Sequence, residues 1–173
     1  MAGQAGAMCA PSGATALLAG AIGYALGACV QVAPGEMALP TPCADWDLAA
    51  LLAHLTASMA DLEAALRTGH LDLDPNESGP PVPGLDHFVL VGGLPLPAGI
   101  VACTGAVEIA VHGWDVSAAR GRGGPIPPAL ATRMLRLSPL LVTGREGLFG
   151  APVPVPVQAS PGDRLVAYLG RTP

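Results

Sequence analysis

Three ionisable side chains stand in one otherwise apolar stretch of the chain. Between Leu94 and Ala119, only Glu108, His112 and Asp115 are ionisable apart from the thiol of Cys103. In a helix, Glu108 and His112 are i and i+4 and share one flank, which Asp115 continues. Burying a charge without a partner is costly. Some other group is therefore expected to compensate the charge at this place.

A second histidine can complete a metal site. His54 lies at the edge of an apolar helical stripe in "ADWDLAALLAHL", beside Leu51 and Ser58. If the two helices pack together, His54 can face Glu108 and His112 across their seam. Two imidazoles and one carboxylate are a three-ligand metal site with open positions, and we expect its metal ion to compensate the buried charge. These ligand types suit Zn²⁺ best, with Ni²⁺, Fe²⁺ and Mn²⁺ as alternatives. A carboxylate nearby could then orient a ligating histidine, the role we expect for Asp115.

Other interpretations of these residues stay open at this point. A Glu-x-x-x-His pair is also typical of exposed helix faces, and His54 alone is compatible with a histidine at the edge of a core. Cys43 precedes the second predicted helix, where the helix dipole could lower a thiol pKa, although a structural role is favoured. His70 and His87 are expected to be solvated in loops. Both tryptophans are expected to be packing residues: Trp46 and Trp114.

Four helical segments must position these side chains. They are predicted over residues 12–32 with Ser12 as N-cap, from Asp45 or Asp47 to residue 69, over 97–121 and over 127–142. A loop rich in proline and glycine separates the second from the third. The tail contains "APVPVPV", expected to be extended, and "DRLVAYLG", which could form a short final helix. With no convincing sheet beyond a small terminal ribbon, the pattern favours one all-α domain over residues 1–173, a four-helix bundle with a short extended C-terminal tail.

Composition narrows the function classes. Of 173 residues, 51% are hydrophobic and 12% charged, with a net charge of −5, and all eight basic residues are scattered arginines. This distribution predicts neither nucleic-acid nor membrane-surface binding. The four cysteines lack CxxC or disulfide-framework spacing, so we expect reduced thiols and a cytoplasmic location.

Residues 1–35 contain no charged side chain. The absence of a basic segment before the apolar stretch argues against a signal peptide. A membrane helix is the alternative to a bundle helix covered by the other three, but the larger side chains recur at helical spacing and favour the bundle.

Two segments carry a family resemblance. "LPTPCADWDLAALLAHL" and "AVEIAVHGWDVSAA" resemble the actinobacterial metal-binding branch of the DinB-like superfamily, which includes mycothiol-dependent maleylpyruvate isomerases and bacillithiol transferases. The similarity extends to "PIPPALA" and "GDRLVAYLGR" and so covers nearly the whole chain. It implies a four-helix bundle that binds a metal through a histidine of the second helix and the Glu-x-x-x-His pair of the third, at His54, Glu108 and His112.

The resemblance implies a metal-dependent thiol S-transferase or isomerase, with mycothiol as a candidate co-substrate. A small electrophilic metabolite, such as an epoxide, quinone or activated olefin from detoxification or secondary metabolism, would be the substrate. Alternatives are a hydrolase, lyase or cyclase that uses metal-bound water, a non-catalytic metal-binding bundle and, more remotely, an iron oxygenase. The maleylpyruvate isomerases carry a further C-terminal domain with no counterpart in these 173 residues, so we do not expect their isomerisation to transfer. A homodimer is one assembly that the sequence allows.

Overall fold

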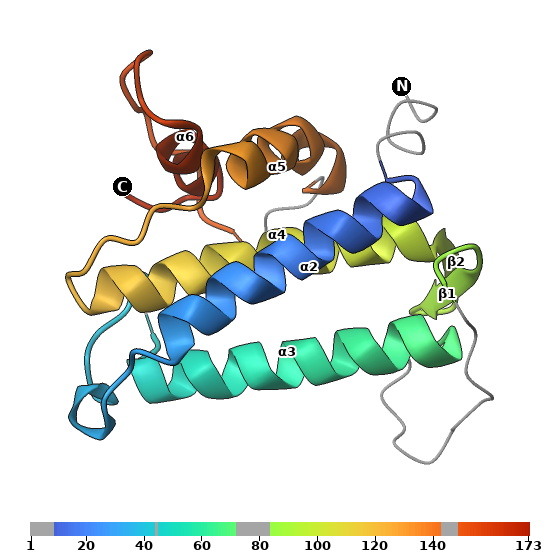
Figure 1. Cartoon of the computed structure of the whole chain (residues 1–173), viewed down its shortest axis with the longest axis horizontal. Coiled ribbons are helices and arrows are strands. Elements are labelled where there is room, and N and C mark those ends of the chain that lie inside the picture. The colour runs from blue at the N-terminus through green and yellow to red at the C-terminus, as the bar shows by residue number, and fades with distance from the viewer. Residues whose placement is uncertain (1–8, 44, 72–83, 143–148) are drawn as a thin grey trace.

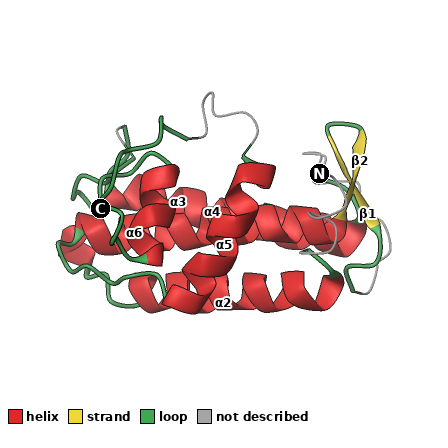
Figure 2. Ribbon diagram, turned by 90° about the horizontal axis from the view of Figure 1, so that it is seen from above, coloured by secondary structure: helices red, strands yellow, loops and turns green. Residues whose placement is uncertain are grey.

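The structure, a computed structural model, is mostly helical (Figures 1 and 2). It describes residues 9–43, 45–71, 84–142 and 149–173. The elements in chain order are α2 (Pro11–Cys29), the 3₁₀ helix η1 (Pro34–Glu36), α3 (Leu48–Thr68), β1 (Phe88–Val91), β2 (Leu94–Pro97), α4 (Ala98–Ala119), α5 (Pro128–Leu141) and α6 (Pro161–Tyr168). The predicted all-α architecture is confirmed: the four long segments and the short final helix are all present.

Local capping explains where the helices begin and end. The Asp47 side chain accepts a hydrogen bond of 2.8 Å from the backbone N–H of Ala50, so Asp47 rather than Asp45 is the N-cap of α3. Gly69 ends α3 in the left-handed conformation, with φ +78°. The predicted N-cap of the first helix was wrong, because α2 begins at Pro11, whose missing N–H needs no cap.

Helix α4 is the centre of the fold. It packs against α2, α3 and α5, and 16 of its 22 residues are buried. Figure 1 shows α2 crossing α4 and α3 running beneath them. The hairpin lies at one end of this arrangement and the C-terminus at the other, as Figure 2 also shows. A polar side chain on α4 therefore either packs against a neighbouring helix or lies on the narrow accessible edge of α4 at Thr104 and Glu108.

The expectation that the other three helices cover the first helix is confirmed only in part. Helix α2 packs mainly on α4, touches α5, and through Ala28 shares a buried cluster with Leu48 and Leu51 of α3, but it leaves Leu26 48% exposed. By length and composition, α2 and α3 could each cross a membrane, but such a pair is weak evidence because core helices pass the same test.

A two-stranded antiparallel hairpin was not predicted at this place. Strands β1 and β2 pair from Phe88 opposite Pro97 to Val91 opposite Leu94. The turn is Gly92-Gly93, and both residues have positive φ, +56° and +77°. Two glycines between short apolar runs are a hairpin signal that the prolines of "LPLP" obscured. The predicted loop before it, residues 72–86, lies mostly outside the described residues.

Helices α2 and α4 approach closely through small residues. A Cβ atom added to Gly113 would lie 2.8 Å from the Cα of Ala25 and 3.0 Å from its Cβ. Because the nearest atom belongs to the backbone of α2, it cannot rotate away as a side chain could. Glycine at position 113 thus sets the distance between the two helices.

We expect Gly113→Ala to lower the free energy of unfolding by about 1–3 kcal/mol, the usual cost of overpacking a core. This is opposite in sign to helix propensity, which favours alanine by up to about 1 kcal/mol. The matched control is Gly23→Ala on α2, where an added Cβ meets nothing within 4 Å. Urea denaturation measures both variants, and equal effects would contradict the close approach.

Candidate metal centre

His54, Glu108 and His112 lie together where α3 packs on α4. The Nε2 atom of His54 is 3.2 Å from Oε1 of Glu108. The ring centroids of His54 and His112 are 5.0 Å apart and nearly perpendicular. One donor atom from each of the three residues lies within 4.8 Å of the others, which is close enough for all three to bind one ion. The helical register therefore brings together the three residues singled out in the sequence.

Ser58 belongs to this cluster as well. Its hydroxyl donates a hydrogen bond of 2.9 Å to Oε1 of Glu108 and lies 3.4 Å from Nε2 of His54. Ser58 is one helical turn beyond His54, so its place follows from the i to i+4 spacing on α3. The side chains of His54 and Glu108 are 34% and 35% exposed, so solvent or a small molecule can reach them.

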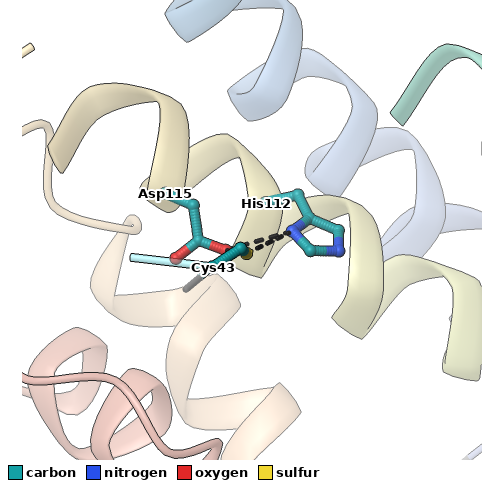
Figure 3. Close-up of side chains that lie close together, drawn as sticks. All are labelled: Cys43, His112 and Asp115. Atoms are coloured by element: carbon teal, nitrogen blue, oxygen red, sulfur yellow. Dashed lines mark hydrogen bonds and ion pairs between the residues drawn. The ribbon is translucent and has the colours of Figure 1, made fainter. Parts of the chain in front are cut away.

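A second group of polar side chains surrounds Asp115, which is fully buried. Its Oδ2 atom lies 3.0 Å from Nδ1 of His112 and 3.3 Å from the thiol of Cys43, which donates to it. Figure 3 shows these three side chains pointing toward one another. When Nδ1 of His112 carries its proton, it donates to Asp115 and leaves the Nε2 lone pair of His112 free.

Arg171 supplies the positive charge that Asp115 needs. Its Nε donates to Oδ1 of Asp115 at 3.3 Å and its Nη2 to Oδ2 at 3.0 Å, a two-pronged ion pair. Arg171 is only 8% exposed. It follows α6, 56 residues after Asp115 in the chain, and no local pattern in the sequence signals this pairing. Sequence reasoning therefore missed Arg171.

The ion pair determines the ionisation of Asp115. Burial by itself would raise the pKa of this carboxyl, but the hydrogen bonds from His112 and Arg171 and the arginine's charge outweigh burial and hold the pKa below its ordinary value. A carboxyl with a lowered pKa stabilises the fold at neutral pH. The folded-state pKa lies below the ordinary aspartate value of about 4, and the stabilisation is lost as the pH falls through that folded-state pKa.

Cys43 is not an activated thiol. Burial, and next the charge of Asp115, raise the pKa of Cys43 to about 11, although Arg171 opposes them. The hypothesis that the helix dipole lowers this pKa was therefore wrong, because desolvation and a neighbouring carboxylate dominate. Cys43, His112 and Asp115 also offer donor atoms within 4.8 Å of one another. A metal ion there would compete with Arg171, whose Nη2 lies 3.5 Å from the Cys43 sulfur.

Trp46 covers the imidazoles. Its ring centroid lies 4.5 Å from that of His54 and 6.2 Å from that of His112. Trp114 packs against the main core, as predicted. The two remaining histidines lie elsewhere. His70 is exposed as expected, whereas the ring nitrogens of His87 are buried and have no hydrogen-bond partner among the described residues, so the predicted solvation of His87 was wrong.

A cavity of about 360 Å³ adjoins the cluster at Ser58 and Glu108. Its wall comes from α3, α4, Leu71 and the hairpin and is mostly apolar. The larger apolar side chains in it include Leu62, Leu71, Val91, Leu96, Ile100 and Ile109. Such a concave, apolar space beside convergent polar groups is typical of small-molecule sites.

The buried ion pair can be tested through stability. We expect Arg171→Met to lower the free energy of unfolding at neutral pH by about 3–5 kcal/mol, because the Asp115 charge then stays buried with fewer partners. Adding Asp115→Asn should restore part of the loss. Arg164→Met, at an exposed position of α6, the helix that Arg171 follows, is the matched control and should change stability little. Chemical denaturation measures all four chains, and a loss in Arg171→Met no greater than in the control would contradict the pairing.

Comparison with known proteins gives the relatives of this chain. Residues 19–81 match the family model of the mycothiol maleylpyruvate isomerase N-terminal domain, a segment that contains His54 but neither Glu108 nor His112. An uncharacterized protein of Mycobacterium tuberculosis, found in strains H37Rv and CDC 1551, is 26% identical over 167 residues, which covers 82% of this chain and 88% of the relative. No solved structure matches the chain. Residues 19–81 are thus similar to the mycothiol maleylpyruvate isomerase N-terminal domain, as the resemblance to the mycothiol-related branch of the DinB-like proteins predicts.

Proposed function

We propose that the protein is a metal-dependent enzyme that joins a low-molecular-weight thiol to a small electrophilic metabolite, or isomerises that metabolite with the thiol's help. The observation that carries this proposal is the convergence of His54, Glu108 and His112 on one point beside an apolar cavity. The relationship to a family named for mycothiol supports a thiol of the mycothiol type as co-substrate.

The donor set fits a divalent metal. Two imidazole nitrogens and one carboxylate oxygen suit Zn²⁺ best, with Ni²⁺, Fe²⁺ and Mn²⁺ as alternatives. Among the described residues, Glu108 forms an ion pair with His54 alone, and that pairing is charged only when the imidazole is protonated. Asp115 differs, since Arg171 already neutralises it. Of the two carboxylates of α4, Glu108 is therefore the one without an arginine or lysine partner among the described residues.

The surrounding side chains would hold the ligands in place. Asp115, itself fixed by Arg171, accepts from Nδ1 of His112 and directs Nε2 away from the ion pair. Ser58 fixes one carboxylate oxygen of Glu108 by donating to it, and the Trp46 ring limits the movement of His54. A divalent metal held by these residues would lower the pKa of a coordinated thiol and so favour its thiolate form at neutral pH.

The cavity beside Glu108 would hold the organic substrate, in detoxification or in secondary metabolism. A soluble, cytoplasmic enzyme is the setting we propose, which agrees with four cysteines that are all free thiols. The partner would be a small molecule rather than a nucleic acid or a membrane.

The metal ligands can be tested by elemental analysis after dialysis. We expect the parent to retain about one equivalent of metal, and His54→Ala and His112→Ala to lose it, because two remaining ligands hold a divalent ion weakly. His70→Ala is the matched control: it removes an exposed histidine just beyond the end of α3 and should leave the metal content unchanged. Circular dichroism verifies that each variant is folded. Stoichiometric metal in folded His54→Ala would show that the ion binds elsewhere.

Glu108→Gln tests the charge in this cluster. Glutamine keeps the shape of the side chain but removes the negative charge, so the variant should bind metal more weakly than the parent. In the metal-free state it should be at least as stable, since it leaves less charge to compensate. Thermal unfolding of both chains in a chelator measures this, and a clearly less stable metal-free variant would contradict the expectation.

The reaction is tested by incubating the metal-loaded protein with mycothiol and a panel of apolar epoxides, quinones and activated olefins. We expect a thioether conjugate or a thiol-dependent isomer, detected by mass spectrometry, and no turnover by His112→Ala. Turnover that is equally fast without the thiol would show that water is the nucleophile and would overturn the thiol-dependent proposal.

A further inference from the structure

The charge on the cavity wall tells which molecules the cavity accepts. Among the described residues that line it, the ionisable groups are Asp61 and Glu108, and both are acidic. The sequence contains no lysine and no arginine between Arg67 and Arg120. The hairpin and the whole of α4 therefore carry no fixed positive charge. Arg67, the nearest arginine before this stretch, is exposed and pairs with Glu63.

Entry of an anionic ligand into this cavity is unfavourable. Moving a carboxylate from water into an apolar space costs several kcal/mol unless a cation or hydrogen-bond donors replace its hydration. Here Thr104 and Ser58 offer hydroxyls, but Thr104 already donates to the carbonyl of Ile100 and Ser58 to Glu108. Asp61 adds repulsion, and so does Glu108 when no metal is bound to it. A neutral, apolar molecule has none of these costs and gains from the leucine and isoleucine side chains.

We propose that the cavity between α3, α4 and the hairpin selects an uncharged, largely apolar substrate and excludes carboxylates and phosphates. This inference rests on the proposed function, because it places the body of the substrate in the cavity and its reactive end toward Glu108. It also predicts that the substrate of this protein differs from maleylpyruvate, the substrate for which the similar family is named. Maleylpyruvate carries two carboxylates. None of the described residues of the wall is a lysine or an arginine, and the single proposed metal at Glu108 leaves at least one carboxylate without a cation.

The size of the cavity agrees with this assignment. At about 360 Å³ it lies at the lower end of the usual range for small-molecule pockets, about 300–1,000 Å³. Gly105 contributes to that space. A Cβ atom at this position would lie 2.3 Å from Cδ2 of Leu62, which also lines the cavity, so a larger residue would displace the leucine side chain.

The test compares two probes of the same shape, cinnamamide and cinnamate, which differ only in replacing a neutral amide by a carboxylate. Binding is measured by ligand-observed NMR titration with the full chain as purified and with its His112→Ala variant. We expect cinnamamide to bind about tenfold more tightly than cinnamate or better, in both proteins. Equal affinities, a preference for cinnamate, or no binding of either probe up to its solubility limit would overturn the proposal.

A matched pair of variants ties the effect to the wall. Thr104 is exposed on α4 and lines the cavity, so longer side chains are tolerated there. Thr104→Arg should narrow the preference for cinnamamide or reverse it, whereas Thr104→Met, of similar reach but uncharged, should keep it. Equal behaviour of the two variants would overturn the proposal.

The His112→Ala variant removes a proposed metal ligand but leaves the cavity wall intact. Loss of metal binding and loss of ligand selection are therefore separate results: the first bears on the proposed function, the second on the cavity.

Discussion

One buried carboxylate joins three distant parts of this chain. Asp115 lies inside α4 with no exposed surface, and it is bonded by Cys43 from the segment before α3, by His112 one turn away and by Arg171 after α6. Without these donors the charge would make the helix packing unfavourable. With them, the C-terminal segment is held against the centre of the bundle, and the imidazole of His112 has one preferred orientation.

Because of this pairing, the two acidic residues of α4 differ in role: Asp115 stabilises the fold, and Glu108 is left for the proposed metal. Asp115 is neutralised inside the protein by an arginine that is itself buried. Glu108, two turns earlier, is partly exposed and has a serine and a histidine as its partners. We expected a metal ion to compensate the buried charge of this helix. The compensating group for the fully buried carboxylate is Arg171, and the proposed metal would serve the half-exposed one.

The packing of α4 also explains why a cavity exists on one side of it. On the side of α2, glycine and alanine let the two backbones come close, and little space is left between them. On the other side, α3 and the hairpin bring leucine and valine side chains, which together with isoleucines of α4 enclose a space that adjoins Glu108. The same helix therefore provides a tightly packed face and a face that borders a cavity.

The sequence by itself determined the helices and half of the site. The apolar periodicity, the Asp47 cap and Gly69 define α3, and the i to i+4 spacing of Glu108 and His112 places both on one flank of α4, because these are properties of neighbouring residues. The Gly92-Gly93 turn was also a local signal, hidden by the prolines around it. Only the tertiary structure decided that Arg171 neutralises Asp115, that burial raises the pKa of Cys43, and that none of the described residues lining the cavity is a lysine or an arginine. These depend on which segments meet across the fold and on how much water they exclude, and neither quantity is a function of spacing along the chain.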